Sequence, residues 1–472
     1  MGKINDRKQQ ASNHQDGFDH EDKAPTRAAV LVPVLPDRYM QNDSDDAEPV
    51  RFQRSSEARL EEACGLARAI DLEIIMAEIV NVSQPRPATL LGTGRVETIA
   101  EAIEEQEIEL VIVDHALTPV QQRNLEREWK VKVIDRTGLI LEIFGRRAQT
   151  KEGVLQVELA HLNYQKGRLV RSWTHLERQR GGSGFLGGPG ETQIEADRRQ
   201  LQEKILRIKR ELETVVRTRT LHRQKRRKVP HPIVALVGYT NAGKSTLFNR
   251  MTGAGVLAED MLFATLDPTL RRIRLPHGGM VILSDTVGFI SNLPHHLVAA
   301  FRATLEEVLE ADLILHIRDI SDPDNAAQAE DVESILASLG VERNDRKRVY
   351  EVWNKIDLLD ESAHEAALVL AASSTSSDMN DEAKPVAISA YTGEGVPELL
   401  NIIEKRIYGD LKSIDMTFGV DELSMLDGIY QSASNIKREN LEDGSVRIQA
   451  QMTASAAKML EERRFGSKPQ DD

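Results

Sequence analysis

The sequence predicts a multidomain α/β protein with a helical hairpin between two α/β units. Short β-rich runs alternate with helical stretches from Arg27 onward, and a heptad spacing of apolar residues begins near Lys151. A second series of buried strands and helices starts at Pro232. With 472 residues the chain has room for about three domains.

Composition narrows the class of protein. Apolar residues make up 40% of the chain and charged residues 29%, and no apolar run approaches the ~18 residues of a membrane span. The polar start of the chain lacks the apolar stretch of a secretory signal. Cys64 is the single cysteine, which excludes a disulfide framework and a cysteine-based zinc cluster. We therefore expect a cytoplasmic protein without a membrane partner.

The first α/β unit is expected over residues 27–146, after a disordered polar tail over residues 1–26. Its alternating runs predict a mainly parallel sheet covered by helices. These runs are Ala28–Leu35, Ser55–Ile70, Leu72–Val82, Val96–Glu105, Leu110–Asp114, Pro119–Trp129 and Val131–Ile134.

An antiparallel helical hairpin is expected over residues 147–229. The join between its two helices, Gly181–Thr192, holds six glycines and a proline in twelve residues and should be a non-helical loop. The heptad residues are Leu155, Leu159, Leu162, Leu169, Trp173 and Leu176 in the first helix, and Ile194, Leu201, Ile205, Ile208, Leu212 and Val215 in the second.

Charge sets this hairpin apart from the rest of the chain. The net charge is -14, yet Arg146–Lys228 holds 21 Lys or Arg against 9 Asp or Glu, a local +12 that leaves -26 elsewhere. A basic surface on a cytoplasmic protein favours an RNA partner, and Phe185 at the tip is suited to contact with bases. The alternatives are a floppy linker at the tip and a merely solvated face for the basic run Arg223–Lys228.

A phosphate-binding loop follows the strand Pro232–Val237 and matches G-x-x-x-x-G-K-S. Its glycines let backbone amides face the phosphates, Lys244 offsets β- and γ-phosphate charge, and the Ser245 hydroxyl can ligate magnesium. We therefore expect a nucleoside triphosphate with Mg²⁺ here. The loop residues are Gly238, Tyr239, Thr240, Asn241, Ala242, Gly243, Lys244 and Ser245.

Two later motifs select guanine. Asn354–Asp357 is N-K-x-D at the end of a strand, and the Asp357 carboxylate can accept hydrogen bonds from guanine N1 and N2, a donor pair that adenine lacks. A second strand ends in Ser389-Ala390, where a backbone amide can meet guanine O6. The expected base-binding residues are Asn354, Lys355, Ile356, Asp357, Ser389 and Ala390, and the expected ligands are GTP and GDP.

Two switch segments are expected between these motifs. Asp285–Gly288 is D-x-x-G after a strand, which places a carboxylate near magnesium and the Gly288 amide near the γ-phosphate. Ahead of it, Thr265, preferred to Thr269, should close over magnesium when the γ-phosphate is present. The switch residues are Phe263, Ala264, Thr265, Leu266, Asp267, Asp285, Thr286, Val287 and Gly288; Lys244, Thr265 and Gly288 are the catalytic candidates, and Ser245 and Thr265 the metal ligands.

Phe289 follows Gly288, where Ras-like enzymes place a glutamine that orients the attacking water. A phenyl ring cannot orient water. We expect slow hydrolysis by the chain alone and acceleration by a partner.

Five further segments carry a family resemblance: Gly92–Val96, Leu117–Pro119, Gln122–Leu125, Gly187–Gln193 and Phe301–Glu307. Through them the sequence resembles the HflX family of translational GTPases between about Ala28 and Pro397. The resemblance implies an N-terminal HflX domain, a Ras-like G domain over residues 230–409 with a mostly parallel sheet and helices on both faces, and binding to the large (50S) ribosomal subunit and its rRNA. The tip, Ser183–Gly187, departs from the usual family sequence.

The family is associated with splitting or rescuing stalled ribosomes under stress and with ribosome biogenesis, which become expectations here, as does a monomer off the ribosome. Beyond the helix Glu398–Tyr408, a helix at Asp421–Ser434 and a strand at Ser445–Met452 predict a small α/β domain over residues 410–472. Two other functions stay open. One is a nucleotide-gated RNA-binding regulator; the other is an ATP-driven remodeller that uses Gly92-Thr93-Gly94 as a second nucleotide site.

Overall fold

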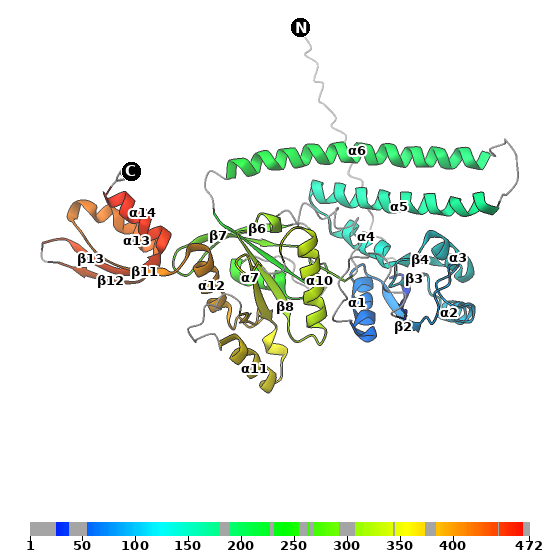
Figure 1. The fold of residues 1–472 in the computed structure, drawn as a ribbon, viewed down its shortest axis with the longest axis horizontal. Helices are drawn as coiled ribbons and strands as arrows, with labels where there is room; N and C mark the ends of the chain where they lie inside the picture. The colour runs from blue at the N-terminus through cyan, green and yellow to red at the C-terminus, as the bar shows by residue number, and fades with distance from the viewer. Residues whose placement is uncertain are drawn as a thin grey trace, which may run out of the picture.

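In the residues that it describes, the computed structural model has three sheets, which follow one another along the chain (Figure 1). Two are built mainly of parallel strands and the third is antiparallel, so the expected α/β class is confirmed. The structure describes residues 25–36, 54–179, 189–226, 231–253, 262–263, 266, 268–291, 307–342, 345–372, 384–441 and 443–465.

The N-terminal sheet has the order β2-β1-β3-β4, with all strands parallel. Residues 28–32 of the central strand are fully buried, and alternate side chains enter two different cores. Burial on both faces is typical of a parallel sheet and explains the continuous apolar run. The elements are β1 (Arg27–Val34), α1 (Ser56–Arg68), β2 (Glu73–Asn81), α2 (Thr93–Glu105), β3 (Leu110–Val113), α3 (Pro119–Trp129), β4 (Lys132–Asp135) and α4 (Arg136–Arg147).

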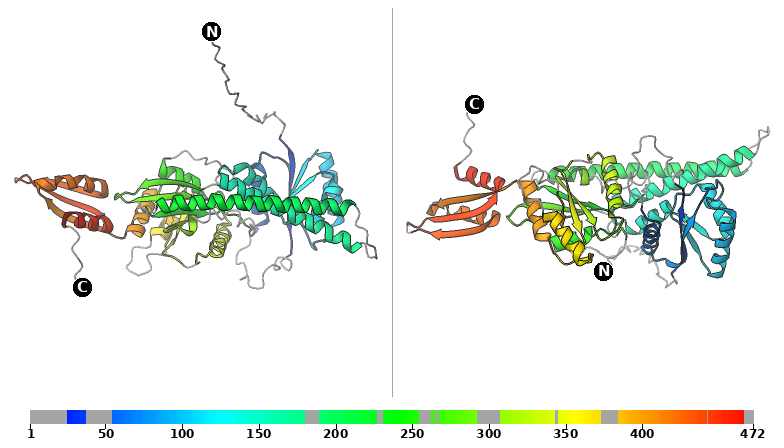
Figure 2. Two further views of the ribbon diagram at one scale, coloured as in Figure 1. Left: turned by 90° about the horizontal axis from the view of Figure 1, so that it is seen from above. Right: turned by 60° about the horizontal axis from the view of Figure 1, so that its bottom comes forward.

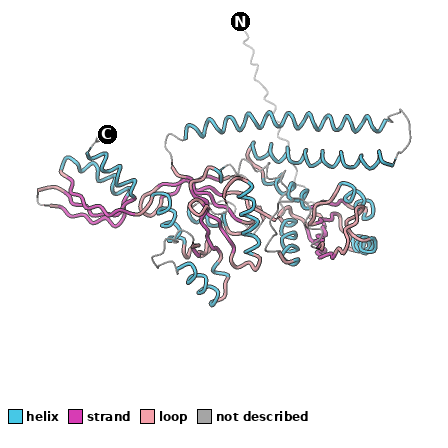
Figure 3. Tube along the Cα trace, in the orientation of Figure 1, coloured by secondary structure: helices cyan, strands magenta, loops and turns pink. Residues whose placement is uncertain are grey.

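Two long helices, α5 (Lys151–Gln179) and α6 (Pro189–Arg226), lie side by side as the expected hairpin (Figure 3). Leu155 and Leu162 pack in one cluster with Ile205 and Ile208, so the heptad seam is confirmed in this half of the hairpin. The non-helical loop was predicted to end at Thr192, but helix α6 already begins at Pro189, so the predicted loop extends too far. Proline is well tolerated at the first position of a helix, because the N–H that it lacks would have no partner within the helix there. The tip, residues 180–188 with Phe185, lies outside the described residues.

The hairpin is anchored to the N-terminal unit through Asp135, the N-cap of α4. Its carboxylate accepts hydrogen bonds from Tyr164 Oη at 2.6 Å and Arg168 Nη2 at 2.6 Å, both on α5. Burial and the adjacent Asp135 carboxylate raise the pKa of Tyr164, which therefore keeps its donor proton. Helix α6 lies outside α5, away from the N-terminal sheet (Figures 1 and 2).

The middle sheet has the order β10-β9-β8-β5-β7-β6, with only β6 antiparallel to its neighbour. Its strands are β5 (Ile233–Gly238), β6 (Thr269–Arg274), β7 (Met280–Asp285), β8 (Leu313–Asp319), β9 (Val349–Asn354) and β10 (Val386–Ala387). The described helices around it are α7 (Lys244–Thr252), α10 (Asn325–Ser338), α11 (Glu361–Ala372) and α12 (Val396–Tyr408).

The C-terminal unit is a three-stranded antiparallel sheet, in the order β11-β13-β12, beside two helices. The predicted helix at Asp421–Ser434 is split into a 3₁₀ turn, Val420–Met425, and α13 (Leu426–Ser432). The predicted strand at Ser445–Met452 is β13 (Val446–Thr453). Sequence reasoning missed β11 (Leu411–Phe418), β12 (Ala433–Asn440) and α14 (Ala454–Phe465). In the described part of the chain, no helix has the length and apolar character needed to cross a membrane.

The C-terminal unit has an apolar core of its own, in which Phe418, Ile429, Ile448 and Met452 are fully buried. If residues 410–472 form an independent domain, Phe418→Ala should lower the free energy of unfolding of that unit alone by about 3–5 kcal/mol. Hydrogen exchange resolved by peptide measures this change. Protection of β5 and β8 should stay unchanged, and loss of protection there would contradict an independent domain.

Candidate nucleotide site

The phosphate loop joins the end of β5 to the start of α7, where the first backbone amides of a helix have no partner within the helix. Gly243 has φ +89°, and a Cβ atom there would lie 2.2 Å from Asn354 Nδ2. Only glycine fits this position. The loop therefore approaches the N-K-x-D segment closely enough that backbone and side chain touch.

Lys244 is buried, and its ammonium lies against the loop itself. Its Nζ donates to the carbonyls of Tyr239 at 2.7 Å and Gly238 at 3.1 Å. Burial lowers the pKa of Lys244 to about 8; the Asp285 carboxylate opposes this change and the Lys355 charge adds to it. A phosphate group beside Nζ would supply the negative charge that this buried cation lacks.

Ser245 and Asp285 bring two oxygen donors together at the ends of α7 and β7. Ser245 Oγ donates to Asp285 Oδ2 at 2.8 Å, and Asp285 is fully buried. A hydroxyl and a carboxylate are the hard oxygen donors that Mg²⁺ prefers. The residues present therefore fit the metal that a P-loop protein uses with its nucleotide.

Asn354 connects the two motifs expected to bind guanine with the phosphate loop. Its Nδ2 donates to Ala242 O at 2.7 Å, and its Oδ1 accepts from the backbone N–H of Ala390 at 2.9 Å. The next residue, Lys355, is in the left-handed region at φ +66° and pairs with Asp319 at 2.7 Å.

The remaining guanine candidates surround this connection. Asp357 is exposed in a short 3₁₀ turn (Ile356–Leu358), where its carboxylate is open to a base. Ser389 is fully buried, and its Oγ accepts from Thr392 N at 2.9 Å. The structure thus brings the predicted phosphate and base residues into one site.

The second switch lies directly on the phosphate loop. Thr240 N donates to Phe289 O at 2.8 Å, and Phe289 N donates to Gly238 O at 3.1 Å. Thr286 is held to β5 through Leu236 O at 2.6 Å. A Cβ atom on Gly288 would lie 3.1 Å from Lys244 Nζ, so the Gly288 backbone faces the phosphate region. Val287, beside it, is buried.

The first switch is described only in part. Phe263 and Leu266 are both buried, whereas Ala264, Thr265 and Asp267 lie outside the described residues. The less preferred candidate, Thr269, is the first residue of β6.

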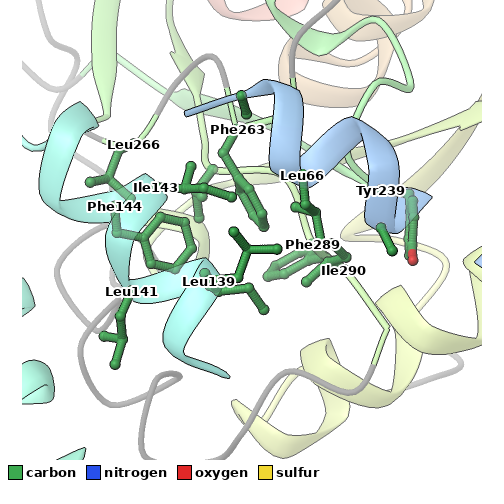
Figure 4. Close-up of a cluster of buried hydrophobic side chains, with 14 of the residues drawn as sticks. Leu66, Leu139, Leu141, Ile143, Phe144, Tyr239, Phe263, Leu266, Phe289 and Ile290 are labelled. Carbon is green, nitrogen blue, oxygen red and sulfur yellow. The ribbon is translucent and has the colours of Figure 1, made fainter. Parts of the chain in front are cut away.

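An apolar cluster joins both switches to the N-terminal unit (Figure 4). The rings of Phe263 and Phe144 of α4 meet edge to face, with centroids 4.8 Å apart. Phe289 is 1% exposed and belongs to the same cluster. Sequence reasoning treated Phe289 only as a missing glutamine; in the structure its ring is part of the contact between the two units.

A buried polar network lies beside this cluster and centres on the Tyr239 hydroxyl. That hydroxyl donates to Glu62 Oε2 at 2.5 Å and accepts from Ser291 N at 2.9 Å. Arg136 bonds Glu62 Oε1 at 2.6 Å and the Ser291 carbonyl at 3.0 Å, and Arg54 pairs with Glu62. Burial, and then the nearby Glu62 carboxylate, raise the pKa of Tyr239 well above its usual value.

Sequence reasoning assigned Tyr239 only to nucleotide binding and missed Glu62, Arg136 and Ser291. One signal was present. Tyr239 is the bulkiest side chain in a loop whose amides should bind phosphate, so its ring must pack against something outside the loop. Nothing in the sequence named the partner, because Tyr239 and Glu62 are 177 residues apart.

The parallel sheet, the phosphate loop and the loops gathered around it define a P-loop GTPase. Four family models match the chain: "GTP-binding GTPase N-terminal" over residues 57–145, "GTP-binding GTPase Middle Region" over 147–226, "50S ribosome-binding GTPase" over 233–355, and "HflX C-terminal domain" over 375–472.

GTPase HflX of Magnetococcus marinus is 50% identical over 89% of this chain and 91% of its own. GTPase HflX of Escherichia coli is 43% identical over 88% of this chain and 95% of its own. A GTP-binding protein from Sulfolobus solfataricus, solved in complex with GDP, is 22% identical, covering 81% of this chain and 98% of that chain with a TM-score of 0.42. The chain belongs to the HflX family and is an enzyme that hydrolyses GTP.

Tyr239→Phe should destabilise the chain by about 1–3 kcal/mol, because it removes the hydroxyl that donates to the buried Glu62 carboxylate. Urea denaturation measures the loss. The control is Tyr391→Phe, on a side chain that is 78% exposed, where a change within about 0.5 kcal/mol is expected. Equal losses in the two variants would show that the network contributes no stability.

GTP affinity should fall as the pH rises above about 8. The free protein loses the Lys244 proton near that pH, whereas bound phosphates raise the pKa of the ammonium, so binding takes up a proton. Calorimetry in two buffers of different ionisation enthalpy measures this uptake. The Lys244→Arg variant, whose side chain does not deprotonate, should show none. Equal proton uptake in both proteins would assign it to another group.

Proposed function

We propose that this GTPase binds the large ribosomal subunit through its basic hairpin and that its nucleotide state governs that binding. The observation that carries the proposal is the outer helix α6, which packs on α5 through one apolar seam and whose exposed side chains include more basic than acidic groups. The exposed basic side chains among its described residues are Arg198, Arg199, Lys204, Arg207, Lys209, Arg210 and Arg217.

The charge on α6 suits a polyanion such as rRNA, because each Lys or Arg that meets a phosphate releases counterions. The match of residues 233–355 to a model described as a 50S ribosome-binding GTPase supports the same partner. In the view of Figure 2 seen from above, α6 extends from the phosphate-loop domain to the far end of the N-terminal unit. This 38-residue helix therefore offers its basic side chains to rRNA along the length of the N-terminal unit.

In the proposed mechanism, Lys244 and the phosphate-loop amides hold the β- and γ-phosphates, and the Gly288 amide contacts the γ-phosphate. Ser245 and Thr265 would hold Mg²⁺, with Asp285 beside them; the metal, when bound, offsets phosphate charge. Asp357 and the Ala390 amide would read the guanine edge, with Asn354 between them.

The chain itself supplies no glutamine at Phe289 to orient the attacking water. We propose that the ribosome accelerates hydrolysis by ordering the switches or by adding a polar group. The enzyme would act as a monomer in the cytoplasm, and splitting or rescue of stalled ribosomes, or a part in ribosome biogenesis, would be its task. A nucleotide-gated RNA regulator remains the second candidate, favoured by the same basic surface.

The third candidate is an ATP-driven remodeller that would use Gly92-Thr93-Gly94 as a second nucleotide site. Gly92 is the N-cap of α2 and Gly94 lies in the first turn of that helix. A helix start alone does not distinguish a nucleotide site from an ordinary turn, so we do not propose this function.

Arg198→Gln with Arg199→Gln should weaken binding to large subunits and reduce the slope of log affinity against log salt by about 0.7–0.9 for each lost phosphate contact. GTP hydrolysis without ribosomes should stay unchanged, while its stimulation by large subunits should fall. Sedimentation and phosphate release measure the two effects.

The matched control is Lys458→Gln with Arg463→Gln, two exposed basic residues on α14. This variant should bind as the parent does. If both double variants lose the same affinity, the charge of the whole chain, and not the hairpin, directs binding. If hydrolysis is equally fast with and without large subunits, the proposed acceleration is wrong.

A further inference from the structure

The loop after β10, residues 389–395, closes on itself through Ser389. The Ser389 carbonyl accepts from Gly393 N at 2.8 Å, and Ser389 N donates to Glu394 O at 3.0 Å. These bonds fix the shape of the loop. Neither bond uses the carbonyl of Ala390 or of Tyr391 as an acceptor.

Arg250, in the last turn of α7, holds both carbonyls. Its Nε donates to Ala390 O at 2.6 Å, and its Nη2 donates to Tyr391 O. The turn leaves room for this guanidinium because Gly393, at φ +98°, has no side chain; a Cβ atom there would lie 2.7 Å from Arg250 Nη1. The loop therefore has the shape that a forked donor at this position requires.

Ala390 is consequently fixed on both sides. Its N–H donates to Asn354 Oδ1 at 2.9 Å, and its carbonyl accepts from Arg250 Nε. Guanine O6 would share this N–H with Asn354 Oδ1 or replace that acceptor. The two peptide groups that flank one residue set its φ and ψ, so a residue bonded through both cannot rotate its amide freely. Arg250 thus links the helix that begins at the phosphate loop to the amide assigned above to guanine O6.

We propose that Arg250 is a positioning residue for guanine recognition, which holds the Ala390 amide where it meets O6. The inference rests on the proposed assignment of Ala390 to the base. The alternative is a purely electrostatic role, in which Arg250 places a positive charge at the C-terminal end of α7, as any cation would. Lysine separates the two, because it keeps the charge but lacks the planar fork that reaches two carbonyls at once.

The test compares two ligands in the full-length protein: GDP and 2-aminopurine riboside diphosphate, which lacks the oxygen O6. Arg250→Lys should weaken GDP binding about tenfold, the equivalent of one hydrogen bond. It should weaken binding of the analogue less than about twofold, because that ligand has no O6 to lose. The turnover number at saturating GTP should not change, since the phosphate residues are untouched.

Gly393→Ala provides a second variant that changes no charge, because at φ +98° its methyl group would strain the 389–395 loop and crowd Arg250 Nη1. It should reproduce the selective loss for GDP. Arg271→Lys, at an exposed position on β6, is the matched control and should leave both affinities unchanged. Thermal denaturation of each variant shows that the chain remains folded.

Equal weakening of GDP and analogue by Arg250→Lys would overturn the proposal, because it would mean that Arg250 supports the fold and not the O6 contact. Unchanged GDP affinity would overturn it as well. The proposed guanine site is tested separately by Asp357→Asn, which should shift preference from guanine toward xanthine nucleotides. If that shift is absent, the base assignment fails independently of Arg250.

Discussion

The hydrogen bond between the Tyr239 hydroxyl and the Glu62 carboxylate is the contact on which the arrangement of the nucleotide site depends. Both side chains are buried, as is Arg136, which bonds the same carboxylate. A hydrogen bond to a buried charged group contributes about 1.5–3 kcal/mol. Because Glu62 and Arg136 come from the N-terminal unit while Tyr239 and Ser291 come from the nucleotide-binding unit, moving one unit alone would break the Tyr239–Glu62 and Arg136–Ser291 hydrogen bonds.

The apolar cluster beside this network also attaches both switch segments to the N-terminal unit. Phe263 and Phe289 come from the two switch segments and pack in one core with Phe144 of α4. Protein interiors are close-packed, so such a contact either holds or rearranges in a discrete step. Any nucleotide-dependent motion of these switches must therefore carry α4 with it or separate from it. This is a physical reason for a GTPase to have an N-terminal unit packed against its site.

Motifs contiguous in the sequence were predictable, and contacts between distant segments were not. Gly238–Ser245 and Asn354–Asp357 each specify a loop by local chemistry, and their order along the chain was enough to infer one site. The Tyr239–Glu62 pair has no local signature. The start of α6 at Pro189 was missed because glycine density was read as a loop, although proline is tolerated at a helix start. Strand β11 was missed because few of its residues are buried.

The start of α4 joins the two halves of the molecule. Asp135, its N-cap, bonds Tyr164 and Arg168 of the hairpin, and the next residue, Arg136, bonds Glu62 and the Ser291 carbonyl. Two adjacent residues thus hold the helical hairpin on one side and the segment after the second switch on the other. Because a helix moves as a rigid body over a few turns, a force on α5 and a rearrangement at Ser291 act on the same element. A shift of α4 would therefore affect both the hairpin, whose surface is proposed to meet RNA, and the site that hydrolyses GTP.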